Sequence, residues 1–260
     1  MAVVRLDKYL ANAGCGTRTQ VKKLLKDGLV RVNDMTVTDP AMKIQEETDL
    51  VICRGQAVSR DHFIYLMLNK PAGLVTATRD RKQETVLDLI PPVYRKDLFP
   101  VGRLDIDTEG LLLMTNDGAL GHHLLSPRHH VDKTYYARIR GRVTDEDIAR
   151  FSEGLDIGEE KPTMSAVLTI VKDGTGEGSA AEGQDAWDQE VTVTIQEGKY
   201  HQVKRMFEAV GKQVVYLKRL SMGSLHLDAD LKPGEYRLLT AAEVRSLEQG
   251  MAARARTQSE

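Results

Sequence analysis

The first fifty residues place apolar side chains at helical spacing and then at strand spacing. The helical positions are Leu6, Leu10 and Ala13, followed after a glycine turn by Val21, Leu24 and Leu25. This pattern predicts two short amphipathic helices, the second of which ends at Gly28. The apolar positions that come next are Val30, Val32, Val37 and Ile44, and they predict short strands.

Longer apolar and alternating runs follow from residue 63 onward. The run FIYLMLNKP at 63–71 predicts a buried strand that stops at Pro71, because proline has no N–H to donate to a central sheet. Further strands are expected in LLLM, TYYARIRG, AVLTIVKD, QEVTVTIQEG and VVYLKRLSMGSLHL, and helices in DEDIARFSEGL and HQVKRMFEAVG. The expected fold class is therefore α+β, with a mixed and largely antiparallel sheet.

Polar segments without periodicity set the expected domain boundaries. The stretch RGQAVSRDH at 54–62 predicts a linker between a small module at 1–53 and a larger domain at 63–247. A glycine-rich acidic stretch at 173–190 predicts an exposed loop. The tail at 248–260 is expected to be frayed or disordered.

Composition narrows the class of protein. With 260 residues, 41% hydrophobic and 28% charged, the chain can bury one substantial core and a smaller module. Cys15 and Cys53 stand far apart in the sequence without metal-binding spacing, which favours a reduced, cytoplasmic setting. The amino terminus lacks an apolar signal region, and no apolar run approaches membrane-spanning length, so we expect no membrane association.

Charge is local rather than global. The net charge of −2 excludes a strongly basic nucleic-acid binder, but the stretch from residue 5 to residue 31 holds seven cations against two acids. These cations are Arg5, Lys8, Arg18, Lys22, Lys23, Lys26 and Arg31. The cluster predicts a phosphate-binding face and hence an RNA partner, the alternative being an ordinary solvated helix surface.

Candidate chemistry centres on GRLDIDTEGLLL at 102–113, which places Asp105 in a turn that enters an apolar strand. Taken alone, aspartate and glycine beside a strand are ordinary turn residues. Three further segments change this interpretation, namely LNKPAGLVT at 68–76, DKTYYARI at 132–139 and EGKYHQVKRMF at 197–207. Together they supply a carboxylate, a phenol and several cations, with no recognisable cofactor loop.

These segments resemble the pseudouridine synthases, in particular the RsuA-type branch that modifies ribosomal RNA, over most of the chain. The resemblance implies a catalytic domain with a central cleft, in which a uridine is isomerised without a cofactor. It implies that Asp105 is the catalytic carboxylate, that Tyr135 lies against the base, and that Lys204 keeps the carboxylate ionised. It gives Arg103 the task of displacing the target base, the alternative being a surface ion pair with Asp107.

Other residues keep two interpretations. Lys70 either binds phosphate or closes a turn, and the resemblance favours support near the active site. His201 and Gln202 either orient the substrate or cap a helix that starts near residue 201. Tyr136 should point to the opposite face of its strand from Tyr135. Two histidine pairs, 122–123 and 129–130, lack metal-binding geometry, so we expect no metal and assign them surface or RNA-contact roles.

The amino-terminal segment resembles a small RNA-binding module named after a small-subunit ribosomal protein and often called the alpha-L motif. One departure from that motif is Asn33-Asp34 where the family usually has Asn-Gly. Because both residues tolerate positive φ better than most, we expect the hairpin to form with a little strain.

The expected partner is ribosomal RNA or a partly assembled small ribosomal subunit, and the chain is expected to act as a monomer. EGKYHQVKRMF is more similar to the small-subunit enzyme than to its large-subunit relatives. Three alternatives remain open: a large-subunit rRNA pseudouridine synthase, a catalytically idle rRNA-binding assembly factor, and an N-glycosidase that stops after bond cleavage. Asp105 and Asp107 are too close together for a glycosidase pair on opposite sides of a sugar.

Overall fold

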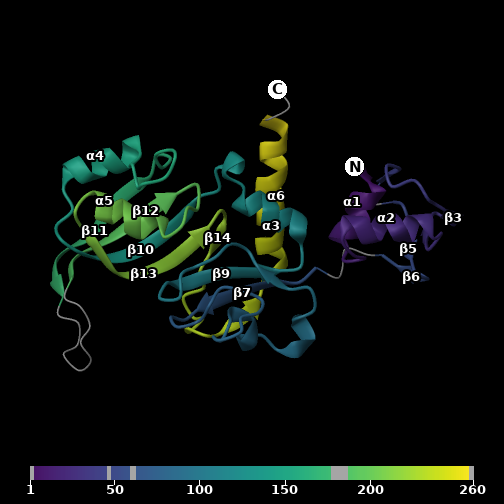
Figure 1. The fold of residues 1–260 in the computed structure, drawn as a ribbon, viewed down its shortest axis with the longest axis horizontal. Coiled ribbons are helices and arrows are strands. Elements are labelled where there is room, and N and C mark those ends of the chain that lie inside the picture. Colours follow the sequence, from purple (N-terminus) through teal and green to yellow (C-terminus); the bar gives the residue numbers. More distant parts are fainter. Residues whose placement is uncertain (1–2, 46–47, 59–62, 177–186, 258–260) are drawn as a thin grey trace. The chain divides into compact units, whose positions relative to one another are not determined.

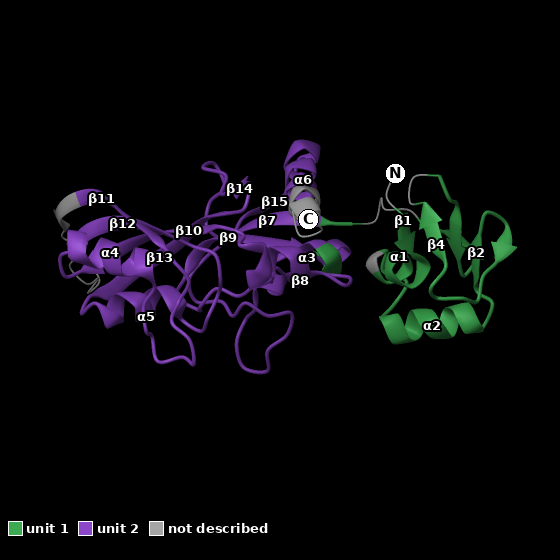
Figure 2. Cartoon of the chain, turned by 90° about the horizontal axis from the view of Figure 1, so that it is seen from above, with its two compact units in different colours: residues 1–64, 115–119 green, residues 65–114, 120–260 purple. Residues whose placement is uncertain are grey.

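A computed structural model describes residues 3–45, 48–58, 63–176 and 187–257. The chain divides into two compact units, as Figure 2 shows. Unit 1 comprises residues 1–64 with 115–119, and unit 2 comprises residues 65–114 with 120–260.

Unit 1 contains the two predicted amino-terminal helices and two small sheets (Figure 1). Its helices are α1 (Leu6–Asn12) and α2 (Arg18–Lys26). Strands β1 (Val3–Arg5) and β4 (Lys43–Gln45) pair with each other, and a second sheet has the order β3 (Met35–Thr36), β2 (Val30–Val32), β5 (Val51–Cys53), β6 (Gln56–Ala57). The two predicted helices and the short strands that follow them are confirmed.

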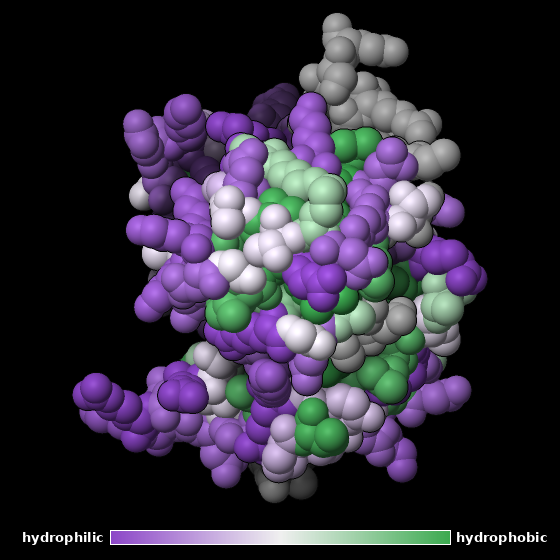
Figure 3. All heavy atoms as spheres, turned by 90° about the vertical axis from the view of Figure 1, so that its right-hand side faces the viewer, coloured by the Kyte–Doolittle hydropathy of each residue, from purple (hydrophilic) through white to green (hydrophobic). Residues whose placement is uncertain are grey.

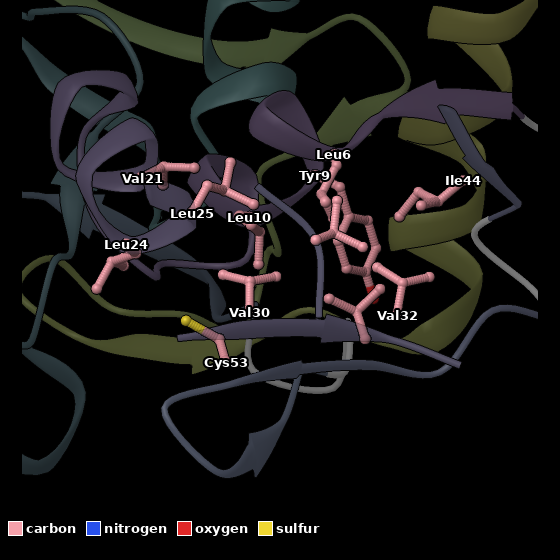
Figure 4. Packing of buried hydrophobic residues seen from close by; sticks show 12 residues of the cluster. Leu6, Tyr9, Leu10, Val21, Leu24, Leu25, Val30, Val32, Ile44 and Cys53 are labelled. Atoms are coloured by element: carbon pink, nitrogen blue, oxygen red, sulfur yellow. The ribbon is translucent and has the colours of Figure 1, made fainter. Parts of the chain in front are cut away.

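A capping box and an apolar stripe fix α2. The Thr17 hydroxyl accepts a hydrogen bond from the Gln20 N–H, and the Gln20 side chain accepts one from the Thr17 N–H. The buried stripe of α2 packs with α1 and the strands into one core, drawn in Figure 4. The cysteines, distant in sequence, meet there, because Cys15 packs against the cluster that contains Cys53. Both are free thiols.

The β2–β3 hairpin forms despite the missing glycine. Asn33 and Asp34 have φ values of 44° and 67°, as expected for a turn of this type. The Asn33 side chain accepts a hydrogen bond from the Leu50 N–H at 2.9 Å and donates one to Asp49 at 2.6 Å. The Arg31 guanidinium donates to the Asp34 carbonyl and carboxylate, both at 3.1 Å. These side-chain bonds hold both residues in a conformation that most residues avoid.

Two polar segments are more regular than their composition predicted. Strand β6 pairs with β5, so the first part of the expected linker 54–62 belongs to the sheet of unit 1, and residues 59–62 lie outside the described residues. Strands β11 (Val167–Gly176) and β12 (Trp187–Ile195) extend into the expected loop at 173–190, of which 177–186 are not described.

The prediction of a frayed tail at 248–260 is wrong for the described residues, because helix α6 runs over Ala241–Thr257. The Thr240 hydroxyl accepts a hydrogen bond from the Glu243 N–H, and Glu243 accepts one from the Thr240 N–H. This cap and the buried Leu247 anchor the helix, and residues 251–256, MAARAR, are strong helix formers.

Unit 2 is built on a nine-stranded sheet with the order β11-β12-β10-β13-β9-β7-β15. Strand β14 pairs with β13, and β8 pairs with β9. Besides β11 and β12, the strands are β7 (Tyr65–Lys70), β8 (Phe99–Pro100), β9 (Glu109–Thr115), β10 (Lys133–Arg140), β13 (Gln213–Met222), β14 (Leu225–His226) and β15 (Tyr236–Leu238). The helices are α3 (Gly118–Leu125), α4 (Asp145–Glu153), α5 (Gln202–Ala209) and α6, with 3₁₀ turns at Val86–Leu89, Pro92–Tyr94 and Pro127–His129.

The sheet is mixed and largely antiparallel. Strand β10 is antiparallel to both β12 and β13, whereas β13 runs parallel to β9. The buried strand β7 ends immediately before Pro71, as predicted. The fold is therefore α+β, with a small amino-terminal unit before the larger sheet.

The parallel contact between β9 and β13 depends on one glycine. Gly110 pairs with Arg219 and has a φ of +99°. A Cβ at this position would lie 2.3 Å from the Arg219 carbonyl oxygen. Only glycine lets these two strands approach, and the contact joins the Asp105 segment to the centre of the sheet.

On the face drawn in Figure 3, hydrophobic and hydrophilic side chains are interspersed. Within the described parts of the chain, no helix combines the length and apolar character needed to cross a lipid bilayer.

Candidate active site

The backbone around Asp105 is held by two buried side chains. Lys70 donates hydrogen bonds from Nζ to the carbonyls of Pro71 (3.0 Å), Ile106 (3.1 Å) and Thr108 (2.9 Å). The Thr76 hydroxyl donates to the Leu104 carbonyl at 2.7 Å and accepts from the Leu104 N–H at 3.2 Å. Asp105 therefore sits between two clamped backbone segments.

Lys70 is fully buried, so the substrate-contact interpretation of this residue is wrong and the interpretation as a turn support is the one that fits. Burial lowers the pKa of its ammonium to about 8. The group still carries its charge at neutral pH, when all three of its protons can be donated to carbonyl oxygens.

The Asp105 carboxylate lies between a lysine and a histidine. Lys204 Nζ is 3.2 Å from Oδ2, and His201 Nε2 is 3.5 Å from Oδ1. Lys204 also donates to Asp107 Oδ1 at 2.6 Å, so the alternative of a surface ion pair between Arg103 and Asp107 is not what forms. Burial pulls the pKa of Lys204 down, but the bond to Asp107 and the charge of Asp105 outweigh it and raise that pKa.

Helix α5 presents Lys204 and His201 to the carboxylate. His201 occupies the N-cap position with a φ of 48°, but its side chain makes no cap and instead stacks on the Tyr200 ring at 3.8 Å. Gln202 is buried, where its side chain accepts from the Lys199 N–H and donates to Glu197, each at 2.9 Å. Gln202 therefore fixes the entry to α5, which fits the helix-cap interpretation. It also lines the pocket beside Asp105, and its contact with the substrate stays a prediction.

A cleft of about 950 Å³ opens in front of Asp105. Tyr135 lines it from β10, and the exposed Arg103 lines it beside Asp105. Among the described residues, Arg103 has no hydrogen-bond or ion-pair partner.

Tyr136 lies on the opposite face of β10 from Tyr135. Its hydroxyl accepts a hydrogen bond from Arg138 at 3.3 Å, and its ring meets the Tyr216 ring edge-on. The prediction that the two tyrosines face opposite sides is confirmed.

The sequence interpretation missed several residues of the cleft. Lys133 and Arg219 are buried cations in its lining, and Tyr200 is 70% exposed at its edge. Lys133 could have been found, because it stands two positions before Tyr135 and so shares its strand face. Arg219 could not have been found, since its placement depends on the register between β10 and β13.

Among the histidine pairs, His123 is buried against His129, which excludes a surface role for His123.

This geometry can serve chemistry that needs one ionised carboxylate. Asp105 is 26% exposed, Lys204 is 19% exposed, and the aromatic ring of Tyr135 lines the same cleft. A carboxylate in such a place can attack carbon or remove a proton, while a flat ring can stack on a nucleobase.

Comparisons with known proteins match both parts of the chain. The RNA pseudouridylate synthase family model matches residues 64–209, and an S4 domain model matches residues 4–50. A Bacillus subtilis protein named uncharacterized RNA pseudouridine synthase YtzG is 44% identical over 253 residues, 96% of this chain and 100% of the relative. Ribosomal small subunit pseudouridine synthase A of Escherichia coli is 40% identical over 246 residues, 94% of this chain and 100% of the relative.

A solved structure supports the same assignment. A crystal structure of a pseudouridylate synthase matches with a TM-score of 0.65 and 37% sequence identity, over 94% of this chain and 99% of that chain. By sequence over nearly the whole chain, and by fold, this chain belongs to the RNA pseudouridylate synthase family and carries an S4 domain at its amino-terminal end.

Proposed function

We propose that this enzyme converts a uridine of small-subunit ribosomal RNA to pseudouridine, with Asp105 as its catalytic residue. The observation that carries the proposal is the contact between Asp105 and Lys204 beside Tyr135 in an open cleft. The names of the Escherichia coli and Vibrio cholerae relatives support the small subunit as substrate.

The reaction breaks the bond between ribose C1′ and uracil N1 and joins C1′ to C5 of the same base. Asp105 can attack C1′ as a nucleophile, or it can remove the C2′ proton as a base to leave a glycal. Both routes require an ionised carboxylate. Lys204 supplies a positive charge 3.2 Å from Oδ2, and Tyr135 supplies a ring against which the base can lie.

A stacked or paired uridine must leave its helix to reach Asp105, at a cost of a few kcal/mol. Arg103 is exposed at the cleft and has no protein partner among the described residues. Its guanidinium can fill the space that the base vacates and contact the flanking phosphates.

The S4 domain supports RNA binding through α2 and its surroundings. Arg5 and Arg31 are engaged by Asp7 and Asp34, so these two cations are partly neutralised. The exposed cations without a partner among the described residues are Lys8, Arg18, Lys22, Lys23 and Lys26. These five cations form a phosphate-binding face within the S4 domain alone, without residues from the catalytic unit.

The test maps pseudouridine by carbodiimide labelling and primer extension on unmodified small-subunit rRNA. We expect a new stop with wild type and with Asp107→Asn, and none with Asp105→Asn. If naked RNA gives no stop, a partly assembled subunit is the next substrate to use. A stop only in large-subunit rRNA contradicts the proposed substrate, and tight binding without a stop on any RNA favours an idle assembly factor.

We further propose that the enzyme acts in the cytoplasm, in keeping with its proposed ribosomal RNA substrate, and that it acts as a monomer, in keeping with a cleft around Asp105 that residues of one chain can line. Sedimentation of the protein at working concentration tests this, and a stable dimer contradicts it.

A further inference from the structure

Two cations of the cleft have no place in the mechanism described so far. Arg219 and Lys133 are only 2% and 5% exposed, and both line the cleft. Arg219 on β13 is the cross-strand partner of Tyr135 on β10, and Lys133 lies two positions before Tyr135. Residues two apart on a strand share a face, so the two cations flank the tyrosine that lies against the base.

Neither cation is fully bonded. Lys133 donates one hydrogen bond, to the Val131 carbonyl at 3.1 Å, and Arg219 donates from Nε to the Leu111 carbonyl at 2.8 Å. Arg219 Nη2 is buried without a hydrogen-bond partner. Within the described residues, no carboxylate lies at ion-pair distance from either side chain.

The acids nearest to Lys133 are engaged elsewhere. Asp132 accepts from Gln196 at 2.8 Å, and Glu197 accepts from Gln202 and from the Met164 N–H. Burial and the neighbouring charge of Arg219 lower the pKa of Lys133 to about 8, so the lysine still carries its charge at neutral pH. Two buried cations without a counter-charge are unfavourable in the empty protein, which indicates that negative charge arrives with the substrate.

The reaction itself produces such a charge. When the C1′–N1 bond breaks, its electron pair leaves with N1, and the free uracil carries a negative charge spread over O2 and O4. This holds whether Asp105 forms a bond to C1′ or takes the C2′ proton. The charge disappears when C5 bonds to C1′: on the first route the Asp105–C1′ bond breaks, and on the second Asp105 returns the proton to C2′. C5 then loses its proton and N1 gains one.

We propose that Lys133 and Arg219 bind the carbonyl oxygens of the detached uracil anion, so that the base turns beside Tyr135 without leaving the cleft. The inference rests on the proposed function. A backbone phosphate is a poorer occupant, because it is bulky, hydrated and tied to the chain on both sides, whereas both cations are almost fully buried. Both cations line the cleft from the strand face that also carries Tyr135, so a flat uracil held against that ring would lie beside them.

The first test compares Lys133→Met, Arg219→Lys and Lys218→Met on RNA with uridine or 5-fluorouridine at the target. Lys218 lies between Leu217 and Arg219 on β13 and so faces away from the cleft. Fluorine makes the base more acidic and hence a better leaving group, and turnover is scored by loss of the original nucleoside after digestion. Thermal unfolding checks that each variant is folded.

With uridine, we expect Lys133→Met to lower the single-turnover rate by about 100-fold, with RNA affinity within twofold of wild type. The loss should shrink to about tenfold or less with 5-fluorouridine, and the charge-keeping Arg219→Lys should lose less than Lys133→Met. Lys218→Met should match wild type. Equal losses with both bases, or weaker binding without a slower rate, overturn the proposal, the latter indicating a phosphate contact.

A second measurement needs no variant of the cleft. Free 5-fluorouracil is titrated by ¹⁹F NMR with and without wild-type protein at millimolar concentration. A cation pair that prefers the anion should lower the pKa of the bound base. No detectable binding, or a pKa that stays at its free value, contradicts the inference. Wild type that isomerises no uridine in any RNA contradicts the proposed function instead.

Discussion

Lys204 forms ion pairs with two carboxylates that differ in solvent exposure. We therefore expect its loss to affect the reaction rate more than the stability of the fold. Asp105 is 26% exposed in the cleft, whereas Asp107 is 71% exposed at the surface. Lys204→Met should lower the single-turnover rate by about 100-fold and the free energy of unfolding by about 1 kcal/mol or less. Urea denaturation and rapid-quench kinetics measure the two effects.

Asp107→Asn serves as the matched control for Lys204. It leaves the contact between Lys204 and Asp105 in place, so its rate should fall less than about fivefold. An equal loss in both variants would show that the three-residue network, and not the pair beside Asp105, supports catalysis.

Lys70 gives the active site an alkaline limit. Its pKa is about 8 in the folded protein against 10.5 in a free lysine, and a neutral amine has too few protons for its three carbonyl partners. The rate should therefore fall by about half at pH 8 and roughly tenfold at pH 9. A pH–rate profile from 6.5 to 9.5 measures this.

Deprotonation of Lys70 should not by itself unfold the protein over this pH range. Between pH 8 and 10.5, Lys70 binds more protons in the unfolded protein than in the folded protein. The titration of Lys70, taken by itself, therefore increases the free energy of unfolding as pH rises. Thermal unfolding over the same pH range is the control for stability. A pH–rate profile of Lys133→Met is the control for the second lysine with a pKa of about 8, because that lysine is absent from the variant. A rate that stays flat to pH 9.5 contradicts the role given to Lys70.

At the scale of single residues, the sequence was most informative where side-chain chemistry was unusual. Asp105, Tyr135 and Lys204 were expected together and do lie in one cleft. For Lys70 and Gln202 the sequence allows both a substrate role and a structural role, and their hydrogen bonds fit the structural one. The direction of a side chain at a helix start or strand end depends on tertiary packing, which the adjacent residues in the sequence do not reveal.

At the scale of elements, the contact between β9 and β13 is sensitive to a single added methyl group. Gly110→Ala places a methyl group against the Arg219 carbonyl at a positive φ, so we expect at least about 3 kcal/mol of destabilisation. Urea denaturation measures the loss. Gly118→Ala, where an added Cβ meets nothing within 4 Å, should remain near wild type. Equal stability of the two variants would contradict the close approach.

Periodicity predicted the local elements better than their pairing. Helices α2 and α5 and strand β7 follow directly from apolar spacing and from Pro71. The parallel pairing of β9 with β13 joins residues more than a hundred positions apart, and only Gly110 hints at it. Helix α6 was missed because an exposed, charged segment lacks the apolar stripe by which helices are recognised.

At the scale of the whole molecule, RNA affinity should depend on the S4 domain and on salt. Changing Lys22, Lys23 and Lys26 to alanine removes three exposed cations of α2. The slope of log Kd against log salt should decrease by about 2, while the rate at saturating RNA stays unchanged. Filter binding at several salt concentrations measures the slope, and the exposed Lys232→Ala is the control. An unchanged slope would place the main RNA contacts elsewhere.

The order in which the site residues occur along the chain has a consequence for biosynthesis. The S4 core uses residues up to Cys53, but the active site needs Asp105, Tyr135, Lys204 and finally Arg219. A ribosome makes the chain from its amino terminus, and early units can fold while later ones are still being synthesised. A nascent chain therefore acquires its RNA-binding cations long before it can modify a uridine, and a product truncated before β13 would occupy RNA without acting on it.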